Sequence, residues 1–197
     1  MAVSSHELGV WGSSILIVLL LGSCSTGPGE GSAVGQVWAP ECGLIGGPFS
    51  LDPNFFAMQP STSVEIIDMR MQRGGDIPNL SDGVSFFIAD PELLKNEMLG
   101  VDIEFELFGS PVQMTLYLNE TCPGLSQIPV VYRAVSGTIR FDELYVPWID
   151  NDTRMTTAQF TGVELVDTAE PEIRRALLSG DISFLFQVGR PAQNFTF

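Results

Sequence analysis

Alternating apolar and polar side chains are the feature that most constrains the fold of this chain. In Val101–Phe108, four apolar residues alternate with three carboxylates, and Val112–Asn119 alternates in the same way. A period of two places one set of side chains on each face of a β-strand. We predict that these two runs form a hairpin around Gly109-Ser110-Pro111. Further β segments are predicted at Val64–Arg73, Val84–Ala89, Val130–Leu144, Ala158–Val166 and Ile182–Val188.

Two short segments have helical rather than β character. Asp90-Pro91 combines an N-cap side chain with a proline at the first helical position, and we expect this helix to reach Leu99. We predict a second helix over Glu170–Leu178, where Glu170 and Arg174 are four residues apart. Amphipathic strands at short spacing, without a βαβ rhythm, predict a mainly β fold. We expect an antiparallel β-sandwich with two short helices in connections, and a closed β-barrel is the alternative.

The N-terminal stretch is apolar but short. Val10–Leu21 fits the apolar core of a secretory signal and is shorter than the roughly 20 residues that span a bilayer. It is closed by Leu21-Gly22-Ser23-Cys24, which resembles the lipobox of bacterial lipoproteins. The resemblance implies that residues 1–23 are a signal peptide cut before Cys24. It also implies that Cys24 is lipidated and holds the protein on a membrane.

The resemblance to lipoproteins also predicts where the protein is located and how its domains are arranged. Ser25 follows the lipidated position where some bacteria use an aspartate to retain lipoproteins at the inner membrane, so we expect the outer membrane of a bacterial cell envelope. Residues 24–36 are dominated by Gly, Ser and Pro, which is typical of flexible linkers. We therefore predict a lipidated cysteine with a flexible linker over 24–36 and a single β-rich domain over 37–197.

The acidic composition narrows the range of partners. The 197 residues include 24 acidic and 9 basic side chains, for a net charge of −15. Nucleic-acid binding needs clustered Lys and Arg, so we expect no nucleic-acid partner. The partner expected from the lipid is the membrane, and the sequence does not identify a protein or glycan partner.

The cysteines predict one disulfide. If Cys24 is lipidated, Cys42 and Cys122 form a pair in an oxidising compartment. Their disulfide would close a loop of about 80 residues, worth about 4–5 kcal/mol of loop-closure entropy. Two buried free thiols are the alternative.

The sequence contains few groups that could perform catalysis. The single histidine, His6, lies in the predicted signal peptide, which argues against Ser-His-Asp and Cys-His mechanisms and against zinc sites with histidine. We therefore predict no catalytic residues and no cofactor. Asp102, Glu104 and Glu106 form a row of carboxylates about 6.6–6.8 Å apart, which we interpret as a solvated strand face because the spacing is too wide for one calcium ion.

Two loop features could bind a ligand. We predict no metal site, with Asp150 and Asp152 kept as the calcium candidate because clustered loop oxygens suit that ion. The same residues also suit a plain turn. Tyr145 and Trp148 could stack on a sugar or peptide, although aromatic side chains more often pack in the core.

Two classes of function stay open at this stage. The first is an envelope lipoprotein that acts as a non-catalytic binding or structural module, and the lack of a catalytic motif favours it. The second is a carboxylate-based hydrolase that acts on envelope polysaccharide, which would need two carboxyl groups about 5–9.5 Å apart. A cleft with two facing carboxylates and a raised pKa would favour the hydrolase.

Overall fold

The protein is mainly β and consists of antiparallel strands. The computed structural model describes residues 25–74, 81–122, 130–150 and 154–187. The strands are β1 (Ser25–Thr26), β2 (Gly29–Ala39), β3 (Leu44–Leu51), β4 (Phe55–Ser61), β5 (Ile66–Gln72), β6 (Asp82–Ile88), β7 (Ile103–Glu104), β8 (Val112–Leu118), β9 (Val131–Glu143), β10 (Met155–Val166) and β11 (Arg175–Leu185). The helices are η1, a 3₁₀ turn over Pro40–Cys42, and α1 over Pro91–Glu97. Within these ranges, no helix has the length and apolar character needed to cross a bilayer.

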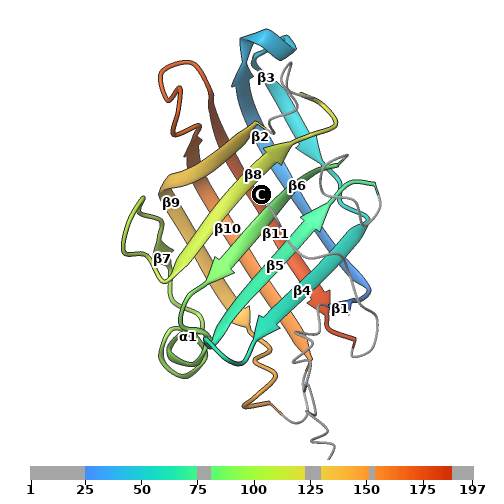
Figure 1. Cartoon of the computed structure of the whole chain (residues 1–197), viewed down its shortest axis with the longest axis vertical. Helices are drawn as coiled ribbons and strands as arrows, with labels where there is room; N and C mark the ends of the chain where they lie inside the picture. Colours follow the sequence, from blue (N-terminus) through green and yellow to red (C-terminus); the bar gives the residue numbers. More distant parts are fainter. Residues whose placement is uncertain (1–24, 75–80, 123–129, 151–153, 188–197) are drawn as a thin grey trace, which may run out of the picture.

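All eleven strands lie in one hydrogen-bonded sheet. Its order is β1-β4-β5-β6-β8-β9-β10-β11-β2-β3, and β7 pairs with β9 outside this path. The sheet curls into a half-barrel with its core on the concave side (Figure 1). The predicted inward faces are confirmed, because Met69, Met71, Val84, Phe86 and Leu116 are almost completely buried.

The first two strands pair with different parts of the sheet. β1 is antiparallel to β4, whereas β2, only two residues later, lies between β11 and β3. At the junction, the Gly27 amide donates to the Phe56 carbonyl at 3.4 Å. The Leu185 amide donates to the Pro28 carbonyl at 2.9 Å. The N-terminal segment therefore bridges the β4 and β11 regions of the curled sheet.

The predicted linker over residues 24–36 is wrong for the described part, because β2 begins at Gly29. Its glycines serve close packing rather than flexibility. A Cβ on Gly35 would lie 1.9 Å from the Leu177 carbonyl oxygen, and one on Gly31 would lie 2.5 Å from that of Asp181. These positions accept only glycine because β2 and β11 approach closely there. The folded domain therefore extends to Ser25, while Cys24 and the predicted signal peptide lie outside the described residues.

The predicted helix over Glu170–Leu178 is also wrong. Arg175–Leu185 forms β11, which pairs along its length with β10 and β2. Ala176 and Leu178 are buried on one face, so pairing on both sides outweighs a modest local helix preference. The other helix is confirmed: the Asp90 carboxylate accepts from the Leu93 amide at 2.9 Å and caps α1.

The predicted hairpin of Val101–Phe108 with Val112–Asn119 does not form. Only Ile103–Glu104 is a strand, and it pairs with β9, while β8 pairs with β6 and β9. The segment is tied to β9 by hydrogen bonds from the Gly100 amide to Phe141 O at 2.8 Å and from the Phe105 amide to Gly137 O at 2.9 Å. The carboxylates on the outer face of this segment, Asp102, Glu104 and Glu106, are exposed at the surface.

Candidate functional site

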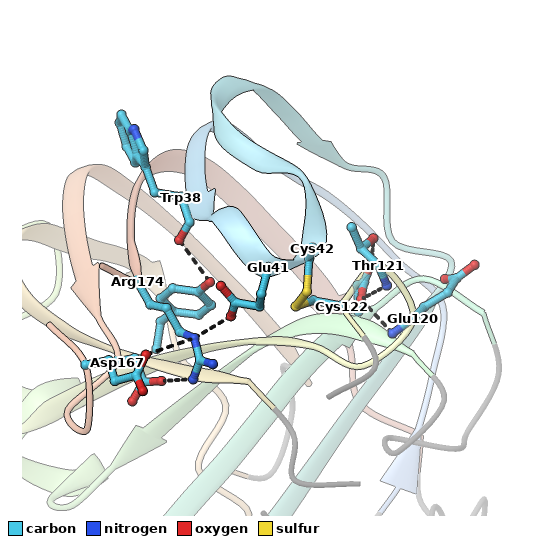
Figure 2. The surroundings of a disulfide bond; sticks show 11 residues. Trp38, Glu41, Cys42, Glu120, Thr121, Cys122, Asp167 and Arg174 are labelled. Atoms are coloured by element: carbon cyan, nitrogen blue, oxygen red, sulfur yellow. Dashed lines mark hydrogen bonds and ion pairs between the residues drawn. A yellow bond between two sulfur atoms is a disulfide. The ribbon is translucent and has the colours of Figure 1, made fainter. Parts of the chain in front are cut away.

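A densely bonded polar region lies at the end of the sheet opposite α1. We call it the disulfide end and define it as η1, residues 119–122 and residues 166–175. Cys42 of η1 and Cys122 after β8 form a disulfide with a Cα–Cα distance of 5.3 Å (Figure 2). The disulfide predicted from the sequence is thus present. It joins the β2–β3 connection to the end of β8.

Asp82 fixes the Cys122 side of this end. Its carboxylate is fully buried at the start of β6 and accepts the backbone amides of Glu120 and Thr121 at 2.9 and 3.0 Å. It also accepts hydrogen bonds from the Thr121 hydroxyl and, at 2.9 Å, from the Arg73 guanidinium, with which it forms an ion pair. One carboxylate therefore holds the turn that positions Cys122.

Arg174 fixes the Cys42 side. Its guanidinium binds Asp167 at 2.8 Å and Glu41 at 2.5 Å, and Glu170 lies at 3.9 Å (Figure 2). The hydrogen bond to Asp167 raises the pKa of the guanidinium above its usual value, and Glu41 adds to this effect. Because Glu41 precedes Cys42, the cation ties η1 to the β10–β11 turn.

An aromatic side chain lies on the outer surface beside this cluster. The Trp38 ring contacts the Arg175 guanidinium, 4.7 Å from the ring centroid. It also covers Gly46, where a Cβ would lie 2.4 Å from the indole nitrogen. Below it, the Trp38 carbonyl accepts from the Tyr132 hydroxyl at 3.2 Å, and Figure 2 shows the indole pointing away from the disulfide. The ring is thus a fixed feature of the surface.

The disulfide, ion pairs and hydrogen bonds of the disulfide end hold connections of the sheet together. Ligand atoms of Glu41, Cys42 and Cys122 lie within 4.8 Å of one another, a spacing that metal sites also show. The disulfide, however, uses both sulfur atoms, so neither is a thiolate ligand. What this arrangement achieves is the cross-linking of three connections at one end of the sheet.

The other residues singled out from the sequence lie elsewhere. Asp102, Glu104 and Glu106 are exposed, which agrees with a solvated face. Asp150 accepts from Lys95 at 2.6 Å and from the Val146 amide at 2.7 Å, so its carboxylate caps a turn. Asp152, the second calcium candidate, lies outside the described residues.

The aromatic pair does not form an open platform. Tyr145 is buried, with its ring 5.0 Å from that of Phe186. Trp148 is partly buried, and its indole nitrogen donates to Glu92 of α1 at 2.8 Å. The structure therefore assigns these two side chains to packing and to fixing α1.

Two features relevant to carboxylate catalysis occur on different strands. Burial raises the pKa of Asp68 on β5 to about 6. A separate shallow groove of about 570 Å³ lies over β10 and β11, and Glu30 and Asp181 are among its lining residues. Asp68 does not line this groove, so the raised pKa and the paired carboxylates are not parts of one site.

Sequence reasoning missed the Asp82 and Arg174 clusters. Glu41 and Arg174 are 133 positions apart, so no local spacing could reveal their ion pair. Comparison with known proteins adds no assignment: no protein-family model, curated protein or solved structure matches this chain.

Proposed function

We propose that the chain is a cell-envelope lipoprotein, anchored through Cys24, whose β domain is a non-catalytic binding or structural module. The observation that carries this proposal is the Cys42–Cys122 disulfide. A disulfide of this kind fits an oxidising compartment. It also uses two of the three cysteines and leaves Cys24, which stands at the end of the lipobox-like sequence. Two or three acyl chains on Cys24 would suffice for stable attachment.

The non-catalytic part of the proposal follows from how the polar groups are used. Asp82, Arg174 and Asp150 each make several bonds that hold turns or helices in place. The hydrogen bonds and ion pairs of these side chains stabilise the fold. A scaffold of this kind is suited to presenting a rigid surface, such as that around Trp38.

We further propose that the sheet closes as a barrel rather than splitting into a sandwich. The support is the bridging N-terminal segment, in which Gly27 bonds to Phe56 of β4 and Pro28 bonds to Leu185 of β11. Closure would leave β3 as a short flap outside the ring and remove most unpaired strand edges.

Intact mass of the protein from membranes of its native host, beside a Cys24→Ser variant, tests the anchor. We expect a chain that begins at Cys24, carries diacylglycerol and acyl mass, and loses both additions in the variant. The same spectrum should show a two-proton deficit that reduction restores. A full-length or unlipidated chain would overturn the proposed function.

The second candidate function is a carboxylate-based hydrolase, which the groove containing Glu30 and Asp181 favours. Glu30 pairs with Ser183 and Asp181 with Ser32, so the two carboxylates are diagonal neighbours on adjacent strands. A glycosidase needs two such carboxyl groups near each other. Release of reducing ends from envelope polysaccharide, abolished in both Glu30→Gln and Asp181→Asn, would establish this activity. Equal release by wild type and variants would rule out these carboxylates.

A further inference from the structure

Five exposed apolar side chains lie at the end of the sheet opposite the disulfide. We call it the α1 end and define it as the β4–β5 turn (residues 62–65), α1 with residues 98–101, and residues 144–150. Val64 is 61% exposed, Val101 48% and Ile149 40%. Leu93 and Leu99 are also exposed. Phe108 at 83% and Ile45 at 77% are more exposed and lie elsewhere, so exposure alone does not single out this end.

Part of this surface is one bonded unit. The Trp148 indole donates to Glu92, and Lys95 pairs with Asp150 at 2.6 Å. These contacts hold α1 against the 144–150 turn. Leu93 and Ile149 are therefore presented on a fixed support rather than on independent loops.

The described chain begins at the same end. Ser25 pairs with Met58 and Thr26 with Ala57, so the chain before Ser25 runs toward the β4–β5 turn. Ile88, which leads into α1, pairs with Ile67 just after that turn. Figure 1 accordingly shows β1 and α1 toward one end and the β2–β3 connection at the other.

The attachment leaves little freedom of orientation. Adjacent Cα atoms are about 3.8 Å apart, so Cys24 is one peptide away from a paired strand. From Met58, β4 continues three residues to Ser61 before the turn, roughly 10 Å along the strand. Acyl chains embedded at Cys24 would thus bring Val64 and its neighbours into the headgroup region.

We propose that the α1 end rests on the lipid bilayer, with Val64, Leu93 and Ile149 in contact with lipid and the disulfide end directed away from the membrane. This inference rests on the proposed lipidation of Cys24. A zwitterionic bilayer suits this end better than an anionic one, because the exposed Glu65, Asp90 and Glu97 lie there and an anionic surface would repel them.

Single tryptophans test the orientation. In a Trp38→Phe/Trp148→Phe background, the mature chain carries tryptophan only where it is introduced, at Val64→Trp or, as the matched control, at Ile45→Trp. Ile45 is 77% exposed at the far end. The lipidated proteins are placed in phosphatidylcholine–phosphatidylethanolamine vesicles that contain brominated phosphatidylcholine. We expect the Val64→Trp protein to lose most of its emission and the Ile45→Trp protein to keep it.

Hydrogen exchange on the unsubstituted protein gives a second readout. Amides of residues 62–65, 146 and 148–150 should exchange more slowly on vesicles than in the unlipidated Cys24→Ser protein, and those of residues 43–47 should not change. Intact mass of the same samples separates the two proposals. A lipidated protein with equal quenching at both positions, or with no local protection, overturns the orientation alone. A protein without lipid overturns the anchor and the orientation that rests on it.

Discussion

Replacing Asp82 with alanine is expected to destabilise the disulfide end strongly. The substitution removes the acceptor of the Glu120 and Thr121 amides, which bond to the carboxylate at 2.9 and 3.0 Å. A hydrogen bond to a charged group is worth about 1.5–3 kcal/mol, so losing these two part-buried bonds should cost at most about 3–6 kcal/mol. Arg73, whose side chain is 41% exposed, adds little because water can solvate it again.

Urea denaturation at neutral pH measures this cost. The midpoint should fall for Asp82→Ala at an unchanged slope, and Asp82→Asn, which keeps one acceptor oxygen, should lie between the variant and wild type. Asp102→Ala is the matched control because it removes an exposed carboxylate and should change stability by less than about 0.5 kcal/mol. A loss below about 1 kcal/mol for Asp82→Ala would refute the role of this carboxylate in holding the turn.

The same reasoning predicts coupling between Asp82 and the disulfide, because both restrain residues 119–122. In a double-mutant cycle with Cys42→Ser/Cys122→Ser, the effects should depart from additivity by about 0.5–3 kcal/mol. Additive effects would show that the two restraints act independently.

Three further predictions concern other parts of the fold. Cys42→Ser/Cys122→Ser should lower the free energy of unfolding by up to about 4–5 kcal/mol, and equal urea midpoints for the variant and the oxidised wild type would contradict this. Because burial raises the pKa of Asp68 from 3.8 to about 6, the folded state favours the protonated form and stability falls as pH rises through that window. Asp68→Asn should therefore be about 1–2 kcal/mol more stable than wild type at pH 8, after allowance for the partial exposure of Asp68. The difference should be smaller at pH 4.5. A difference that does not change with pH would exclude the raised pKa of Asp68 as its cause. Lys95→Met should cost about 1–3 kcal/mol, since it leaves Asp150 and the Leu144 carbonyl without their charged donor, and unchanged thermal unfolding would refute it.

The strand faces could be predicted from the sequence because burial on one side imposes a period of two. Val84 and Phe86 follow that rule, and so does the buried face of β8. On β5 both faces are covered, because Arg70 and Gln72 are buried as fully as Met69 and Met71. The pairing of strands could not be predicted as readily. The segment at Val101–Phe108 has the clearest alternation in the chain, yet only two of its residues form a strand, and these pair with β9 rather than with β8.

The errors at residues 24–36 and 170–178 share a physical cause. Composition suggested a linker in the first segment and local spacing suggested a helix in the second, but the two segments contribute to the same interface between β2 and β11. Gly35 is needed there because of the Leu177 carbonyl, which belongs to the other segment. The structure of either segment could not be predicted without knowing that it pairs with the other. The ion pair of Glu41 with Arg174 likewise joins residues far apart in the sequence.

The pairing of β2 with β11 has a consequence for the order in which the chain can fold. Trp38 lies opposite Arg175 and Gly29 lies opposite Phe184. The first long strand, β2, therefore completes its pairing only when β11, the last strand described, is present. Until residues 175–185 are available for pairing, β2 can pair only with β3, and β10 has only β9 as a neighbour. Such distant contacts slow folding. A nascent chain that stops before Arg175 would leave two strands without the partner they share.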